Sequence, residues 1–551
     1  MRAARILEIG VALFGLSAAA ASAAEALTDA GKAIYQRGVL ASGAPLEGTR
    51  PTTGLPVKGG EAACVNCHQR SGLGTFEGYN LAVTIPPITG QYLFHSRSAT
   101  STEPVLPYLE WMHGNRDPYT DATVARAIRE GLDSQGRPLN ALMPRFTLGD
   151  ADMAALIGYL KSLDLRSVPG VGDTVLDFAT VITPDADPVK RRGMLDVMEH
   201  YFADKNQFPI GNSAQLRTSG KTEYAKSMFM SHRLWHLHVW ELTGPAATWT
   251  AQLQQHMAKE PVLAIVSGLG GSNWAPVHEF CEQQGVPCLF PNVEVPVDND
   301  HDFYPLYFSK GVLLEANLIA RAIAASAQGG SAVTVQQVYR AGDSGEAAAP
   351  ALAAALKGRA ITVRSRALPA GARGQGVAEA LRGSNASVLV LWLRPDDLAA
   401  LGDPSPAPAA VFVSGLMGGL ERSPLPAPWR GRAKMAYPYD LPDRRDLRLR
   451  YPLGWFSIKH IEVVDEPVQA NTYLACGLLA ETLSHMADNL VQPFIVEMLQ
   501  SSIEKRLINT GYYPRMALGW NQHFASKGGY IVHFAEAGGT SLVADSDWVV
   551  P

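Results

Sequence analysis

The residues of this 551-residue chain that most clearly carry chemistry are Cys64, Cys67 and His68, in the sequence C-V-N-C-H. Two thiols at this spacing can each form a thioether bond with a vinyl group of haem, and the histidine that follows can bind the iron. A second axial ligand is then needed, and Met143 is suited to this role because it lies on a loop just before Pro144. The motif therefore predicts one covalent haem c with His68 and Met143 as iron ligands.

Other interpretations of this motif have less support. A zinc knuckle needs a second ligand pair nearby, but the next cysteine is Cys281. A thioredoxin-like pair would follow a strand in a βαβ unit, which the Gly-rich, polar flanking sequence does not predict. The second iron ligand has rivals: Met112 and Met153 are alternative methionines, and His95 or His113 would give two histidine ligands.

The first 23 residues are typical of a cleaved export signal. Arg2 and Arg5 give a basic start, an apolar run extends over 9–20, and Ala21-Ser22-Ala23 fits a cleavage site. The run is shorter than the roughly 20 residues that a transmembrane helix needs, and no later segment is predicted to cross a membrane. We therefore expect a periplasmic protein without a transmembrane segment.

The composition indicates an ordinary globular protein of more than one domain. The chain is 47% hydrophobic and 18% charged, and its net charge of −5 gives no sign of nucleic-acid binding. Its length favours two or three domains. Outside the haem motif, Cys281 and Cys288 could form a disulfide in an oxidising compartment, and Cys476 lies in an apolar segment that predicts burial.

Short helices must position the haem motif within residues 24–165. Helices are expected over 29–36, 120–130 and 151–162, with Gly131 ending the second and Asp150 capping the third. A rigid loop containing Pro86 and Pro87 lies between the haem motif and the second helix.

This domain resembles the class I cytochromes c. The matching pieces are C-V-N-C-H, the Pro-Pro loop, M-P-R-F at Met143 and the helix D-A-D-M-A-A-L-I-G-Y-L-K-S-L. The resemblance implies an all-α domain in which Cys64 and Cys67 hold the haem, His68 is the proximal ligand and Met143 the distal ligand. It also implies a carrier of single electrons, because an iron with both axial positions filled does not normally activate a substrate.

After a predicted linker over 166–176, strands and helices alternate through residues 177–551. Predicted strands include 178–182, 236–240, 262–266, 388–392 and 410–414, and predicted helices between or after them include 194–202, 249–257, 275–284 and 472–488. Strands separated by helices of this length imply parallel sheets with βαβ crossovers. So many units predict two doubly wound α/β lobes.

This second region resembles the type 1 periplasmic binding proteins, specifically the branched-chain amino acid receptors of ABC importers. The stretches V-L-A-I-V-S-G-L-G-G-S-N-W-A-P-V and G-Y-Y-P-R-M-A-L-G-W-N-Q-H-F-A-S-K-G-G-Y-I-V carry the resemblance. It implies a two-lobed fold that binds a small molecule.

The expected ligand site lies at Gly271, Ser272 and Asn273, where a strand ends and a helix begins. Free N–H groups there favour an anion such as a carboxylate, although a Gly-rich turn that only joins strand to helix is the alternative. Tyrosines 304, 307, 437 and 439 could line the cleft.

Histidines 232, 236 and 238 have a spacing that metal ligands can have, but a structural or surface role is the favoured interpretation. No Ser/His/Asp elbow, P-loop or paired-carboxylate motif stands out, so we expect no enzymatic activity.

These features lead to one main prediction of function and one alternative. The main prediction is a periplasmic monohaem cytochrome that carries electrons to or from a dehydrogenase or oxidase and is coupled to a solute-binding domain. The alternative is an ABC-importer solute-binding protein for an amino acid or small organic acid, with an accessory haem.

Overall fold

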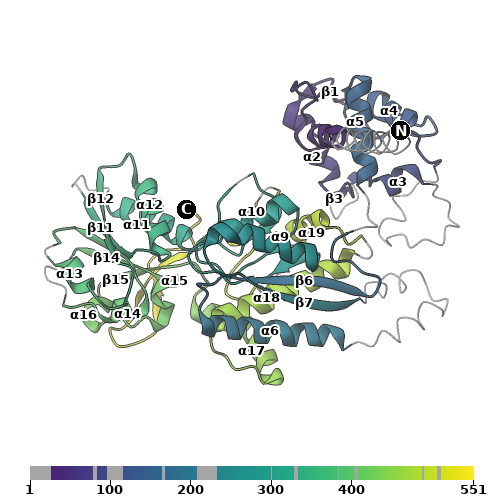
Figure 1. Ribbon diagram of the computed structural model, residues 1–551. Helices are drawn as coiled ribbons and strands as arrows, with labels where there is room; N and C mark the ends of the chain where they lie inside the picture. The colour runs from purple at the N-terminus through teal and green to yellow at the C-terminus, as the bar shows by residue number, and fades with distance from the viewer. Residues whose placement is uncertain are drawn as a thin grey trace, which may run out of the picture. The chain divides into compact units, whose positions relative to one another are not determined.

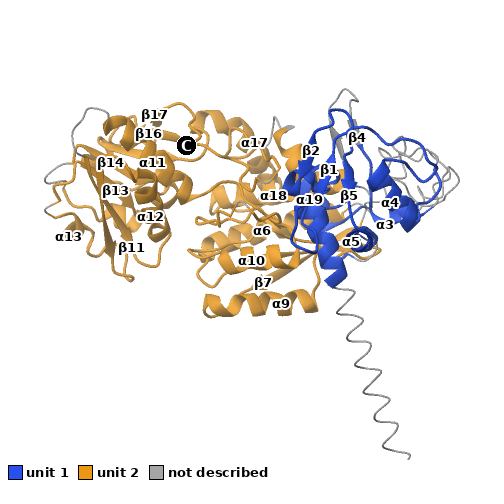
Figure 2. Ribbon diagram, turned by 90° about the horizontal axis from the view of Figure 1, so that it is seen from above, with its two compact units in different colours: residues 1–168, 213–231, 486–497 blue, residues 169–212, 232–485, 498–551 orange. Residues whose placement is uncertain are grey.

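The computed structural model describes residues 26–77, 83–95, 116–163, 168–207, 233–299, 301–327, 333–382, 384–403, 408–486, 489–505, 510–520 and 522–551. The predicted export signal, Met112, His113 and His232 lie outside these residues. The chain forms two compact units, coloured separately in Figure 2. The first comprises residues 1–168, 213–231 and 486–497, and the second comprises residues 169–212, 232–485 and 498–551.

The first unit combines short helices with short strands. Its helices are one over residues 26–37, α2 (Val65–His68), α3 (Gly90–Phe94), α4 (Asp121–Glu130) and α5 (Asp150–Ser162). Its strands are β1 (Glu47–Thr49), β2 (Pro56–Lys58), β3 (Thr75–Glu77), β4 (Val83–Ile85) and β5 (Arg145–Thr147).

The expectation of an all-α first domain therefore needs correction. Strands β2, β1 and β5 form an antiparallel sheet in this order, and β3 pairs with β4. The segment 45–58 contains several prolines and glycines, which are poor in helices but fit short extended pieces and turns.

Helix α4 begins and ends where its local sequence predicts. The Thr120 side chain accepts a hydrogen bond from the Thr123 backbone N–H and so caps the first turn. The helix stops at Gly131, whose φ of 73° is the left-handed conformation that glycine adopts without strain.

Helix α5 supplies much of the first unit's core. Its buried apolar side chains include Met153, Leu156, Ile157 and Leu160, as its sequence periodicity predicts. Asp150 is not the cap of this helix but its first residue, following Gly149, and it forms an ion pair with Arg129 at 2.8 Å.

The second unit contains two α/β lobes, which confirms the predicted two-lobed α/β architecture. The first lobe is built on a parallel sheet of order β10-β9-β8-β6-β7. Its strands are β6 (Val175–Ile182), β7 (Leu234–Glu241), β8 (Ala264–Val266), β9 (Cys288–Leu289) and β10 (Pro305–Leu306). Helices α9 and α10 lie on one face of this sheet and α6 on the other (Figure 1).

The second lobe is built on a sheet of order β12-β11-β13-β14-β15-β16-β17. Neighbours from β12 to β15 are parallel, whereas β16 and β17 are antiparallel. The strands are β11 (Val333–Arg340), β12 (Ile361–Leu368), β13 (Val388–Trp392), β14 (Ala410–Ser414), β15 (Ala433–Tyr437), β16 (Tyr530–Phe534) and β17 (Leu542–Ala544). Strands β13 and β14 have the predicted bounds.

The helices of the second unit pack on both sheets. They are α6 (Pro188–Asn206), α9 (Trp249–Lys259), α10 (Ala275–Gln284), α11 (Val312–Ser326), α12 (Gly345–Leu356), α13 (Val377–Leu381), α14 (Pro395–Ala399), α15 (Gly415–Gly418), α16 (Ala427–Arg430), α17 (Pro442–Lys459) and α18 (Glu466–Met486). Helix α19 (Gln492–Ser502) begins in the first unit and ends in the second.

The three cysteines outside the haem motif form one disulfide and one buried thiol. Cys281 in α10 and Cys288 in β9 form a disulfide, with Cα atoms 6.1 Å apart. Cys476 is buried in α18, as its apolar surroundings predict. Among the described residues, no helix combines the length and apolarity needed to cross a membrane.

Candidate functional site

The first unit contains a mostly apolar cavity of about 1050 Å³. Its wall includes all four residues predicted to hold haem, Cys64, Cys67, His68 and Met143. Other lining side chains come from several elements of the unit and include Tyr35, Leu46, Val57, Leu93, Val124, Ile128, Phe146, Leu156 and Leu160. Residues from separate segments of the sequence thus surround one apolar space.

Helix α2 fixes the two thiols and the histidine relative to this cavity. Val65 is buried in the core, and the Asn66 side chain donates a hydrogen bond to the Gly60 carbonyl at 2.7 Å. These contacts hold the single helical turn from both sides. Cys64 and His68, four residues apart, therefore lie on the same face of the turn.

His68 is held as a neutral imidazole. Burial lowers its pKa to about 4. Its Nδ1 lies 3.1 Å from the carbonyl oxygen of Pro86, on the predicted Pro-Pro loop. A proton on Nδ1 donates to this carbonyl and leaves Nε2 as the nitrogen with a lone pair, which is the state that a metal ligand needs.

The thiol of Cys64 is not a low-pKa redox thiol. Burial raises its pKa to about 12, and the nearby Cys67 adds to the rise. A reactive thioredoxin-like pair needs the opposite shift, because the thiolate is the reactive form. The structure therefore argues against the redox-pair interpretation of C-x-x-C.

The described candidates for the second iron ligand differ in position. Met143 lies on the cavity wall and is half-buried, and its backbone carbonyl accepts a hydrogen bond from Arg145 Nη1 at 2.6 Å. Met153 is buried in the core of α5, and His95 is exposed; neither lines the cavity. The haem and its ligands stay a prediction, but the described residues fit it.

The second unit contains a cavity of about 810 Å³ at the carboxyl ends of strands from both of its sheets. Residues that follow strands of the first lobe and line the cavity are Asp185–Asp187, Leu269–Gly271, Pro291–Glu294 and Tyr307–Ser309. Those of the second lobe are Arg394–Asp396, Leu416, Met417 and Tyr439. Parallel α/β sheets bind ligands at this edge, and the volume suits a small molecule.

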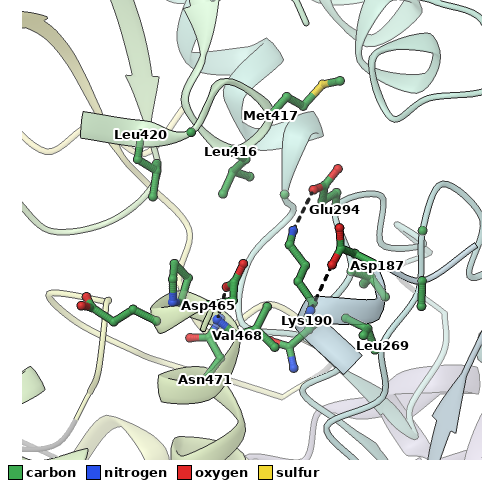
Figure 3. Close-up of a pocket in the computed structure, with 18 of the residues that line it drawn as sticks. Asp187, Lys190, Leu269, Glu294, Leu416, Met417, Leu420, Asp465, Val468 and Asn471 are labelled. Carbon is green, nitrogen blue, oxygen red and sulfur yellow. Dashed lines mark hydrogen bonds and ion pairs between the residues drawn. The ribbon is translucent and has the colours of Figure 1, made fainter. Parts of the chain in front are cut away.

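A cluster of charged residues forms one wall of this cavity. Arg394, after β13, donates two hydrogen bonds to the Glu294 carboxylate at 2.7 and 2.5 Å and also pairs with Asp343 at 2.6 Å. The Lys190 Nζ points toward Glu294 and lies 3.7 Å from its Oε1 (Figure 3). Burial alone would raise the pKa of Glu294, but the ion pair with Arg394, together with the charge of Lys190 and the Ser344 hydroxyl, lowers it.

Two buried amide oxygens on the wall have no hydrogen-bond donor among the described residues. They are the Oδ1 atoms of Asn471, on α18, and Asn292, after β9. Asn471 is only 7% exposed and is drawn at the cavity in Figure 3. A buried acceptor without a donor is costly, so a ligand that offers an N–H or O–H group there would be stabilised.

The cavity wall carries more acidic than basic residues, and several aromatic rings. The acidic residues are Asp185, Asp187, Glu294, Asp396, Glu421, Asp465 and Glu466; the basic ones are Lys190, Arg373, Arg394 and Arg422; the rings are Tyr307, Phe308, Tyr439, Tyr512 and Tyr513. Of the tyrosines singled out in the sequence, Tyr307 and Tyr439 line the cavity, whereas Tyr304 and Tyr437 do not.

The predicted anion site contains a carboxylate of the protein itself. Gly271 lines the cavity, but the Ser272 backbone N–H donates to the Asp185 carboxylate at 3.0 Å. The Asn273 Oδ1 accepts a hydrogen bond from the Ala275 N–H at 3.1 Å. Ligand binding by Gly271, Ser272 and Asn273 stays a prediction, and a ligand carboxylate there would have to replace Asp185.

Comparison with known proteins finds similar solved structures. No protein-family model and no curated protein matches the chain. A fatty acid ABC transporter substrate-binding protein from Thermomonospora curvata is 14% identical, with a TM-score of 0.46 over 70% of this chain and 95% of its own. A leucine-binding protein from Thermotoga maritima is 11% identical, with a TM-score of 0.47 over 68% of this chain and 99% of its own. A branched-chain amino acid ABC transporter protein with bound valine from Thermus thermophilus is 9% identical, with a TM-score of 0.47 over 69% of this chain and 97% of its own.

The comparison corrects the main functional prediction. The named structures are described as substrate-binding proteins, so a cytochrome electron carrier with a redox partner is not retained as the main function. At identities of 14%, 11% and 9%, these structures do not identify the ligand of this chain.

Proposed function

We propose that the chain is a periplasmic solute-binding protein of the ABC-importer class, which takes up an amino acid or a small organic acid in the second unit. The observation that carries the proposal is the cavity at the carboxyl ends of strands from both lobes, with the unpaired Oδ1 atom of Asn471 on its wall. The Cys281–Cys288 disulfide agrees with an oxidising compartment.

The charges of the wall suit a ligand with both an amino or hydroxyl group and an acid group. Asn471 Oδ1 accepts from the donor group, and the surplus of acidic side chains favours a positive charge. Lys190 offers its ammonium to a carboxylate, because its contact with Glu294 is too long for a good hydrogen bond. The aromatic rings cover the apolar part of the ligand.

Thermal unfolding of the full chain with leucine, valine, glutamate, lactate, succinate and octanoate tests this proposal. At least one amino or organic acid should raise the midpoint in a concentration-dependent way, since a ligand that binds only the folded state stabilises it. Asn471→Leu and Lys190→Met should each weaken that binding. The control is Lys434→Met, on β15, where Lys434 pairs with Asp545 away from the cavity. No shift with any of the six compounds would contradict this ligand class.

We further propose that the first unit carries one covalent haem as an accessory group. The support is the apolar cavity that brings Cys64, Cys67, His68 and Met143 together. The two cysteines would attach the group, and His68 and Met143 would bind its iron. A bound haem would supply a redox-active iron at this site. The apolar wall excludes water from it.

Mass spectrometry and the absorption spectrum of the reduced protein test the accessory haem. The exported protein should carry the mass of one haem, and Cys64→Ala with Cys67→Ala should lose it. Met143→Leu should change the spectrum through loss of the sulfur ligand, whereas the matched change Met153→Leu, in the core of α5, should leave it unaltered. An exported protein without added mass, or a spectrum that Met143→Leu does not change, would contradict the corresponding assignment.

A further inference from the structure

Two histidines on β7 lie beside an aspartate on β6, at the edge of the first lobe's sheet. In the parallel register Asp177 is paired with His236, and His238 follows two residues later on the same strand. Side chains two residues apart project from the same face of a strand, so all three project together. This cluster lies near the starts of the strands, whereas the cavity lies at their carboxyl ends.

The three side chains converge on a single point. Asp177 Oδ1 is 2.9 Å from His236 Nδ1 and 2.9 Å from His238 Nε2. One possible ligand atom from each residue lies within 4.8 Å of the other two. In a tetrahedral zinc site with bonds of about 2.0–2.1 Å, neighbouring ligand atoms are about 3.3 Å apart. The two distances from Asp177 would have to lengthen by about 0.4 Å to admit such an ion, and the two imidazole nitrogens lie within 4.8 Å of each other.

A fourth residue orients one of the histidines. His238 Nδ1 lies 3.3 Å from Glu260 Oε2, directly after α9, and its side chain is 14% exposed. Glu260 is itself fixed by Trp240 Nε1 at 3.3 Å and Lys259 Nζ at 2.9 Å. Metal-binding histidines commonly donate their second ring N–H to a carboxylate in this way.

His238 has a carboxylate at each ring nitrogen, Glu260 at Nδ1 and Asp177 at Nε2. A neutral imidazole has one N–H and one lone pair, so it can donate to Glu260 or to Asp177, but not to both. When Nδ1–H donates to Glu260, the Nε2 lone pair faces the negative Asp177 oxygen at 2.9 Å. A cation between Nε2 and the carboxylate turns this repulsion into two bonds.

We propose that Asp177, His236 and His238 bind a divalent transition-metal ion, for which Zn²⁺ is the reference, with Glu260 as the positioning residue for His238. Two imidazoles and one carboxylate are ligands that Zn²⁺ accepts, and water completes the coordination because His236 is 61% exposed. The ion ties β6 and β7 to each other and, through Glu260, to the end of α9. The site is separate from the solute cavity and from the predicted haem.

Zinc binding by the tag-free full chain tests this site. The protein is treated with EDTA, loaded with Zn²⁺, desalted and analysed for zinc by mass spectrometry. His238→Gln, His236→Ala and Asp177→Asn should each lose one equivalent of zinc relative to the unaltered chain. Glu260→Gln should keep the ligands but weaken zinc affinity about 10-fold in competition with a chromophoric chelator. Circular dichroism confirms that each variant is folded.

The matched control is His533→Ala. His533 also faces an aspartate, with Nδ1 2.8 Å from Asp545 Oδ1, but the structure places no second histidine among the described contacts of that pair. This variant should retain the zinc equivalent. Equal zinc content in the unaltered chain and in folded His238→Gln, or no zinc retained by either, would overturn the proposal.

Discussion

Replacing Glu315 with glutamine should remove a pH dependence from the stability of the second unit. Glu315 lies on α11, is fully buried and contacts the start of α15, the short helix that follows β14 and lines the cavity. Its carboxyl group contacts the Ser414 hydroxyl and accepts a hydrogen bond from the Leu416 N–H at 2.9 Å. Burial raises its pKa to about 8, against an ordinary value of 4.5.

The magnitude follows from the difference between these two pKa values. The folded state holds its proton more tightly than the unfolded state, so the stabilising effect is complete below pH 4.5 and is lost as pH rises through 8. Each unit of pKa difference corresponds to about 1.4 kcal/mol, so the loss is on the order of 5 kcal/mol. Glutamine has nearly the shape of the protonated acid, can accept from Leu416 and donate to Ser414, and does not ionise.

Urea unfolding of the chain and of Glu315→Gln between pH 5 and 9 measures this effect. Other titrating groups contribute equally to both proteins and cancel in the difference between their free energies of unfolding. This difference should shift in favour of the variant by about 1.4 kcal/mol per pH unit up to pH 8 and then level off. The control is the same substitution at an exposed position, Glu536→Gln, which removes no buried carboxyl group. A pH-independent difference for Glu315→Gln would refute the reasoning.

Three further predictions concern other buried features. Burial raises the pKa of Glu497 to about 7, so the free energy of unfolding should decline as pH rises from 4.5 through 7. The decline should be on the order of 3 kcal/mol. Urea unfolding of Glu497→Gln should no longer show it. Joint replacement of Cys281 and Cys288 by alanine should lower the free energy of unfolding by about 2.5 kcal/mol, from the entropy of the short loop they close; an unchanged midpoint would contradict this. Asp397→Asn should cost about 3–5 kcal/mol, because it leaves the buried Arg340 guanidinium without its charged partner; a loss below about 1 kcal/mol would show that the pair contributes little.

Features defined by nearby residues could be predicted from the sequence. The caps of α4 at Thr120 and Gly131 depend on neighbours a few positions away. The C-V-N-C-H motif depends on adjacent residues, and the structure places Cys64 and His68 together on one cavity wall. Alternating apolar segments likewise predicted the two α/β lobes, since parallel strands that are buried on both faces form continuous apolar runs.

Features made by distant segments could not be predicted. Asp185 fills the expected anion site at Ser272 because a neighbouring strand ends beside that loop. Asn471 lines the cavity from α18, which follows strands β6 to β15 in the sequence. The proposed metal ligands depend on the register of β6 and β7, which places Asp177 opposite His236. No spacing in the sequence encodes these pairings.

The central claim, that the second unit binds a small solute in its cavity, is tested most directly by a crystal structure of the chain with the solute that stabilises it. The account predicts electron density in the cavity at the carboxyl ends of the strands, with a donor group of the solute within hydrogen-bond distance of Asn471 Oδ1. Density for the solute elsewhere on the chain, with this cavity filled only by water, would contradict the account.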